Sequence, residues 1–296
     1  MGQRAVSRGA AGRLGGWLLA ALAFFGVYAA LTQHPPQSAR LLRLADRSRL
    51  PLAQALPDLL DARVVFVGEL HDRPAHHRAQ LRLIRALHEA GRPLAVGLEM
   101  FRASAQGELD RWVAGELSSA TFRKVYRDNW NYPWEGYGAI WAYAREHGIP
   151  LLGLNVSRAL VRRVAREGFA SLPPDQVAGL PPIRCEVDET YERFIRRALG
   201  AHGRSGPAFL HFCEAQLVWD VGMAYHLGRY LNAHPDTTVV VLAGSGHAWK
   251  RGIPAQLARQ GPVAVRVLVP EIPGRLEPST ATVDDADYLW LDLAPR

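Results

Sequence analysis

The feature that most constrains the fold is a series of short apolar runs, each separated from the next by stretches with helical spacing. The runs cover residues 64–67, 94–98, 151–154, 238–243 and 264–269. Buried parallel strands have this composition because helices cover both faces of a parallel sheet, so each strand is apolar along its whole length. The sequence therefore predicts an α/β domain with a mostly parallel central sheet of five core strands, flanked by helices.

The segments outside these strands complete the expected organisation. Residues 185–233 lack a strand pattern and predict a helical insertion between the third and fourth core strands. Residues 34–62 are rich in proline and arginine and predict a linker with short helices, which leads into an α/β domain over residues 63–272. The C-terminal tail, residues 273–296, contains an apolar run at 288–293 that predicts an added edge strand.

Residues 1–33 combine a basic start with an apolar run over residues 16–31. This pattern predicts an export signal, and Val27-Tyr28-Ala29 fits a small-x-small cleavage site. The run is shorter than the roughly 20 residues of a membrane span. A cleaved signal peptide and a retained signal anchor therefore both stay open. In either case we expect the domain in the periplasm or at the extracytoplasmic face of the inner membrane, with the membrane as a partner if the segment is retained.

Charge and cysteine content limit the partners. The formal charge of +7 is dispersed, and no zinc-finger spacing or RNA-recognition motif accompanies it, so we expect no nucleic-acid partner. The two cysteines, Cys185 and Cys213, could form a disulfide in an oxidising compartment or stay as two buried thiols. Sequence alone does not decide between these alternatives, because it does not supply the geometry.

Polar side chains stand where three of the predicted strands end. Gly68-Glu69-Leu70-His71 follows the first strand, Glu99 ends the second, and Gly244-Ser245-Gly246-His247 follows the fourth. Ligands of open α/β sheets bind at the carboxyl ends of strands. The period of two in an extended chain places Glu69 and His71 on the same side. We therefore expect Glu69, His71, Glu99 and His247 to form one polar pocket.

Carboxylates and imidazoles at one point suit acid–base catalysis, or binding of a divalent metal by His71, His247, Glu69 and Glu99. The simpler alternatives are that Glu69 caps a helix and that Glu99 forms a salt bridge with an arginine. A nucleotide loop fits poorly, because Trp249 occupies the third glycine position of the dinucleotide motif.

Three more polar residues, Asp72, Gln216 and Asp220, are candidates to hydrogen-bond to the side chains of this pocket and orient them. Gln216 and Asp220 are four residues apart on one helical face and could orient a histidine. A polar stripe at a helix surface would have the same spacing. The spacing alone does not separate these two interpretations.

Residues 130–141 contain five aromatic side chains. Tyr137 and Trp141 are four apart in a predicted helix and are most simply core residues. The loop aromatics Trp130, Tyr132 and Trp134 predict either a lid or a flat apolar wall for a ligand.

Taken in order, these motifs resemble the ChaN-like haem-binding uptake family, a branch of the Tiki/TraB/erythromycin-esterase superfamily. The resemblance spans residues 60–270. It implies an exported or surface-tethered protein of iron and haem acquisition, with haem bound by a tyrosine and a homodimer formed around it. The candidate tyrosines are Tyr132, Tyr137 and Tyr126, and the candidate aromatic contacts are Trp130 and Trp134. A phenolate is a hard donor that suits ferric iron, and arginine or histidine can hold the propionates.

The wider superfamily implies a second activity, because its hydrolytic members use Gly-x-x-His pairs and carboxylates for metal binding or base catalysis. The corresponding residues are His71 and His247 with Glu69 and Glu99. The resemblance thus leaves two functions: an exported haem-binding protein, and a metal-dependent or Glu/His-based hydrolase of the esterase or peptidase type. The chain also lacks a lipoprotein cysteine after the apolar run, in contrast to typical haem-uptake relatives.

Overall fold

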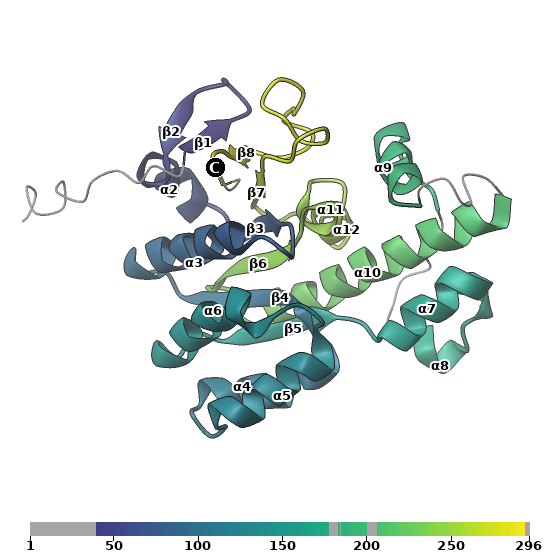
Figure 1. Ribbon diagram of the computed structural model, residues 1–296, viewed down its shortest axis with the longest axis horizontal. Coiled ribbons are helices and arrows are strands. Elements are labelled where there is room, and N and C mark those ends of the chain that lie inside the picture. Colours follow the sequence, from purple (N-terminus) through teal and green to yellow (C-terminus); the bar gives the residue numbers. More distant parts are fainter. Residues whose placement is uncertain (1–39, 178–182, 184, 200–205, 294–296) are drawn as a thin grey trace, which may run out of the picture. The chain divides into compact units, whose positions relative to one another are not determined.

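The computed structural model describes residues 40–177, 183, 185–199 and 206–293. Its centre is an eight-stranded sheet with the order β2-β1-β8-β7-β3-β6-β4-β5 (Figure 1). The strands are β1 (Arg40–Arg43), β2 (Arg49–Pro51), β3 (Val64–Glu69), β4 (Leu94–Arg102), β5 (Leu151–Asn155), β6 (Thr238–Gly244), β7 (Val265–Pro270) and β8 (Tyr288–Trp290). Neighbours from β8 to β5 are parallel, whereas β1 pairs antiparallel with both β8 and β2. The predicted α/β class with a mostly parallel sheet flanked by helices is confirmed.

The helices of the described residues lie between and beside these strands. They are α2 (Leu52–Leu60), α3 (Pro74–Glu89), α4 (Gln106–Val113), α5 (Ser119–Asn129), α6 (Trp134–Glu146), α7 (Arg158–Glu167), α8 (Pro174–Val177), α9 (Glu189–Leu199), α10 (Gly206–Ala233), α11 (Ser245–Ala248) and α12 (Ile253–Ala258), with 3-10 turns η1 (Ala103–Ala105) and η2 (Phe169–Ser171). Between β5 and β6 the described residues include α7 to α10 and no strand, at the place of the predicted helical insertion.

Alternating side chains of the core strands bury against two separate helical layers. Val65, Val67 and Leu98 pack in one cluster with α2, α3 and α4 to α6. Phe66 and Val241 point to the opposite face, where α10 and α12 cover them. Because both faces are covered, each strand needs apolar residues at odd and even positions alike, which explains the apolar runs. Arg266 in β7 interrupts its run at a half-buried position.

Two expectations for the flanking segments differ from the structure. In the described part of residues 34–62, α2 is preceded by β1 and β2, which join the sheet instead of forming a linker. These strands are only four and three residues long and carry arginines, so they lack a clear strand pattern. β1 pairs with β8 from the far end of the chain, and β2 pairs with β1 at the edge of the sheet. The tail strand β8 is also no edge strand, because it lies between β7 and β1.

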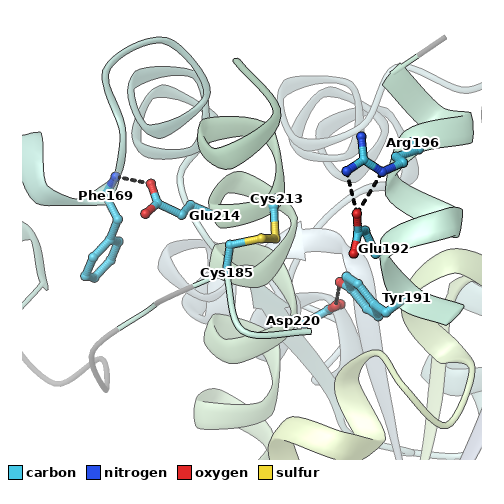
Figure 2. The surroundings of a disulfide bond; sticks show 8 residues. All are labelled: Phe169, Cys185, Tyr191, Glu192, Arg196, Cys213, Glu214 and Asp220. Atoms are coloured by element: carbon cyan, nitrogen blue, oxygen red, sulfur yellow. Dashed lines mark hydrogen bonds and ion pairs between the residues drawn. A yellow bond between two sulfur atoms is a disulfide. The ribbon is translucent and has the colours of Figure 1, made fainter. Parts of the chain in front are cut away.

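The N-terminal segment predicted as a signal lies outside the described residues. Among the described helices, none has the length and apolar character needed to span a membrane. Cys185 and Cys213 form a disulfide, with their Cα atoms 5.7 Å apart, which fastens the segment before α9 to α10 (Figure 2). Of the two alternatives left open by the sequence, the structure has the disulfide.

Candidate functional site

The carboxyl ends of β3, β6 and β4 are adjacent in the sheet and bring the predicted polar residues together. Glu69 is in register with Gly244, whose backbone N–H donates to Oε2 of Glu99 at 2.6 Å. The Nε2 atoms of His71 and His247 each lie 3.9 Å from Oε1 of Glu99. The two histidines and two carboxylates predicted from strand ends therefore meet in one cluster, for which the name polar pocket is kept.

Each imidazole is oriented by a second carboxylate. Nδ1 of His71 lies 2.7 Å from Oε1 of Glu69, and Nδ1 of His247 lies 2.7 Å from Oδ1 of Asp220. A carboxylate at Nδ1 fixes both the rotation of the ring and the position of its proton. Both rings consequently direct Nε2 toward Glu99. Asp220, from the middle of α10, thus orients His247, which is the role that its spacing suggested.

The carboxylates also set the charge of the imidazoles. Burial alone would lower the pKa of His247, but Asp220 and Glu99 outweigh burial and raise it to about 9. Burial likewise opposes the charged form of His71, while Glu69 and Glu99 raise its pKa above the usual value. For Glu69, burial is outweighed by hydrogen bonds from His71 and His77, which lower its pKa to about 2. Burial also raises the pKa of Asp220, against the opposing effect of His247 and Tyr191. The surroundings of both histidines therefore favour the protonated ring, and the imidazole of His247 is cationic at neutral pH.

Glu69 also contacts a buried network that includes His77, a residue that the sequence analysis did not identify. The hydroxyl of Tyr137 donates to Oε1 of Glu69, and Nε2 of His77 lies 3.3 Å from its Oε2. A Cβ atom at Gly136 would come within 2.7 Å of Nδ1 of His77. A glycine inside a helical pattern was the available signal for this close approach. The hydrogen bonds of Glu69 thus go to Oε1, which contacts His71 and Tyr137, whereas Oε2 is buried beside His77 without a hydrogen bond among the described residues.

Asp220 has a second partner that sequence reasoning also missed. The hydroxyl of Tyr191, on α9, donates to Oδ2 of Asp220 at 2.8 Å (Figure 2). Tyr191 is 29 residues away from Asp220, and no periodic pattern connects them. The Cys185–Cys213 disulfide fixes this part of the chain to α10, so the tyrosine, the carboxylate and His247 form one chain of contacts.

Two of the predicted supporting residues do not contact the histidines. The side chain of Asp72 is 69% exposed and lies 3.6 Å from Arg73, because the chain turns outward after His71. Gln216 is half-buried and makes no side-chain hydrogen bond within the described part of the chain. Of the three candidates, only Asp220 orients an imidazole.

The predicted divalent metal site does not fit the geometry. Within the described residues, no group of three or more His, Cys, Asp or Glu side chains is arranged to hold a metal ion. Glu69 is enclosed by His71, His77 and Tyr137, and Oε2 of Glu99 is bound to the backbone of Gly244. Too few carboxylate oxygens are left to close around one ion.

The aromatic loop between α5 and α6 lies over this pocket. The ring of Trp130 meets His71 edge-on, with centroids 5.0 Å apart, and the ring of Tyr132 lies 5.0 Å from His71 on a tilted plane. On this loop is a cavity of about 560 Å³, lined by the aromatics together with Asn131, Pro133, Arg123, Arg127 and Glu135. Glu135 lies 3.9 Å from Arg123, and Arg127 is the other basic group of the lining. The polar pocket and the aromatic wall, predicted separately, are therefore neighbours.

Burial distinguishes the three candidate tyrosines. Tyr126 and Tyr137 are fully buried, and their hydroxyls donate to the backbone oxygen of Tyr132 and to Glu69. Burial, reinforced by the charge of Glu69, raises the pKa of both phenols well above the usual value. Tyr132 is 37% exposed and lines the cavity. It is the one candidate of the three whose oxygen is not engaged in the core.

Trp130 and Trp134 have different surroundings. Trp134 packs edge-on against Phe122 and Tyr126, and the guanidinium of Arg123 lies 5.1 Å above its ring. Both tryptophans line the cavity, but Trp130 also contacts His71. Trp130 therefore connects the cavity with the polar pocket.

The site combines a histidine–carboxylate pocket at the strand ends of an α/β sheet with a neighbouring aromatic cavity. This combination defines a ligand-binding site of an open α/β sheet. The family model for haem-binding uptake proteins of the ChaN type, in the Tiki superfamily, matches residues 55–257, and the protein belongs to this family.

One of the matching solved structures supports the fold. ChaN of Campylobacter jejuni, in a structure described as cofacial haem binding, has a TM-score of 0.66 and 20% identity, covering 84% of this chain and 95% of that one. The erythromycin esterase EreC in its open conformation has a TM-score of 0.49 and 16% identity, over 74% of this chain and 72% of that one. A comparison with curated proteins gave no match.

Proposed function

We propose that the protein binds haem, with the phenolate of Tyr132 as the iron ligand. The observation that carries this proposal is the exposure of Tyr132 inside an aromatic cavity, while Tyr126 and Tyr137 are buried and hydrogen-bonded. Membership of the haem-binding uptake family supports haem as the ligand. The cavity volume of about 560 Å³ is within the range of cofactor sites.

The residues around Tyr132 suit the other parts of a haem. Trp130 and Trp134 offer apolar surface to a porphyrin, and Arg123 and Arg127 supply guanidinium groups for propionates. Ferric haem would contribute a Lewis-acidic iron, for which a phenolate is a hard anionic donor. The two arginines were not among the sequence candidates, because basic residues on an exposed helix carry no pattern that separates them from a solvated face.

A hemin titration followed by absorbance tests the proposal. We expect saturable binding with a tyrosinate-type ferric spectrum in the wild-type protein, and loss of that spectrum in Tyr132→Phe. Tyr126→Phe is the matched control, because it also removes one phenolic oxygen but from a buried position. Absence of a saturable change in the wild type would refute haem binding. A spectrum lost in Tyr137→Phe but kept in Tyr132→Phe would refute the choice of ligand.

We also propose that the protein is exported, acts in iron or haem uptake and forms a homodimer around the cofactor. The basic-then-apolar start of the chain supports export, and so does the Cys185–Cys213 disulfide, because disulfides persist in oxidising compartments. Cell fractionation tests the location, since recovery of the protein with cytoplasmic markers would contradict it. Size-exclusion chromatography with and without hemin tests the dimer.

The polar pocket supports hydrolysis as a second candidate function. The observation in its favour is that Nε2 of His71 and of His247 converge on Oε1 of Glu99 while carboxylates hold both Nδ1 atoms. Because these carboxylates raise the pKa of both histidines, the rings are suited to donate a proton to a leaving group or to stabilise an oxyanion. His247→Gln should then abolish turnover of an ester such as p-nitrophenyl acetate, and an unchanged rate would remove this candidate.

A further inference from the structure

A second cavity, of about 690 Å³, lies at the carboxyl ends of β4 and β5, where α7 packs against α10. Arg102 borders it from the end of β4, Arg163 and Arg166 from α7, and Tyr225 and His226 from α10. It shares no lining residue with the cavity at Tyr132. Arg158 stands between the two, with one guanidinium nitrogen on the side chain of Asn131 and another on the backbone oxygen of Asn129.

The lining of this cavity carries positive charge that its own walls do not neutralise. Three arginines and no carboxylates are among the described residues that line it. Arg163 donates to Glu167 at 3.2 Å, and Arg166 reaches the same carboxylate only at 3.7 Å. Arg102 donates to neutral groups, the side-chain oxygen of Asn129 and the backbone oxygen of Asp128. One carboxylate outside the lining therefore serves two of the three guanidinium groups.

The rest of the lining suits a carbon skeleton as well as a charge. Val156, Ala159 and Leu160 provide apolar surface beside the arginines. On the α10 side, Tyr225 supplies a half-buried ring and hydroxyl, and His226 supplies an imidazole. Burial and the charge of Arg229 lower the pKa of His226, so this imidazole is neutral at pH 7 and can either donate or accept a hydrogen bond. A bare inorganic anion would use only the basic part of such a cavity.

We propose that this cavity binds a small organic polycarboxylate, with its carboxylates on Arg102, Arg163 and Arg166 and its carbon skeleton against Ala159 and Leu160. The planar guanidinium fork matches a carboxylate in a bidentate geometry, and separated arginines match separated carboxylates. The site is independent of the proposed haem site at Tyr132, so either proposal can fail without the other.

Calorimetric titration of the whole protein with citrate, and separately with inorganic phosphate, tests the proposal. We expect saturable citrate binding that weakens about tenfold in Arg163→Gln and again in Arg166→Gln, which is the usual effect of losing a charge-assisted hydrogen bond. Arg162→Gln is the matched control, because it makes the same charge change on α7 at an exposed position outside the lining. Ala159→Trp should block binding by filling the cavity without altering charge.

The proposal is overturned if citrate does not bind saturably, or if Arg162→Gln weakens it as much as Arg166→Gln does. Equal affinity for inorganic phosphate would overturn the organic character of the ligand. Thermal unfolding of each variant identifies folded proteins, and Arg166→Gln keeps the test valid if Arg163→Gln unfolds, because Arg166 is largely exposed. Hemin binding should stay within about twofold in all cavity variants. A parallel loss of hemin affinity would overturn the independence of the two sites.

Discussion

Replacing Asp220 with asparagine should lower the pKa of His247 markedly. In the wild-type protein, burial disfavours the imidazolium, but Asp220 at 2.7 Å and Glu99 at 3.9 Å together raise the pKa to about 9. The rise from the ordinary value of 6.5 corresponds to about 3 kcal/mol of preference for the charged form. A buried, charge-assisted hydrogen bond contributes about 1.5–3 kcal/mol, so Asp220→Asn should lower the pKa by roughly one to two pH units.

The same interaction makes stability depend on pH with a defined sign. Because the folded-state pKa of His247 exceeds the unfolded value, the contribution of His247 to the free energy of unfolding is complete below about pH 6.5. It is lost as the pH rises through about 9. The free energy of unfolding of the wild-type protein should therefore decrease between pH 6.5 and 9. Asp220→Asn should remove roughly half or more of the part of this decrease that His247 contributes.

NMR of selectively ¹⁵N-labelled histidine side chains measures the pKa directly, and urea unfolding at pH 6.5 and 9 measures the stability. Asp72→Asn is the matched control, because Asp72 is exposed and contacts neither histidine. A pKa of His247 that changes by less than about 0.5 in Asp220→Asn would refute the assignment of Asp220 as the dominant partner.

Three further perturbations test the surroundings of the pocket. Reducing the disulfide should destabilise the protein by roughly 3–4 kcal/mol, given its separation of 28 residues, and an unchanged urea midpoint would contradict this. Gly244→Ala should cost about 1–3 kcal/mol, because its Cβ would lie 3.0 Å from two ring atoms of His71, whereas Gly107→Ala, with nothing within 4 Å, should not destabilise. Since the pKa of Glu69 is lowered to about 2, its contribution to the free energy of unfolding is present above about pH 4.5 and is lost as the pH falls toward 2. Glu69→Gln should flatten that acid limb, and an unaltered acid unfolding curve would count against the pairing with His71.

The core strands and the pocket could be predicted because their patterns are local. Five predominantly apolar runs, the last of them interrupted by Arg266, indicated buried parallel strands, and parallel strands end at one edge of the sheet. Glu69, Glu99 and His247 therefore had to lie close together once their strands were adjacent. In the structure, Glu69 lies in register with Gly244, and the backbone N–H of Gly244 donates to Glu99.

The remaining parts depend on long-range packing that no local pattern reports. The strand β1 pairs with β8, about 250 residues later in the chain. Tyr191 meets Asp220 because a disulfide holds the segment before α9 on α10. The choice among the three tyrosines required knowledge of burial, because the family resemblance names no one tyrosine and helical spacing indicates only that Tyr137 is most simply a core residue. Burial by neighbouring elements, and not sequence spacing, separates them.

The proposed haem site depends most on the phenolate of Tyr132 as the ligand of ferric iron. Resonance Raman spectroscopy of the hemin complex, excited in the phenolate-to-iron charge-transfer band, detects this bond directly. We expect phenolate vibrations in the wild-type protein and in Tyr126→Phe, and their disappearance in Tyr132→Phe. Phenolate vibrations that persist in Tyr132→Phe would contradict Tyr132 as the iron ligand.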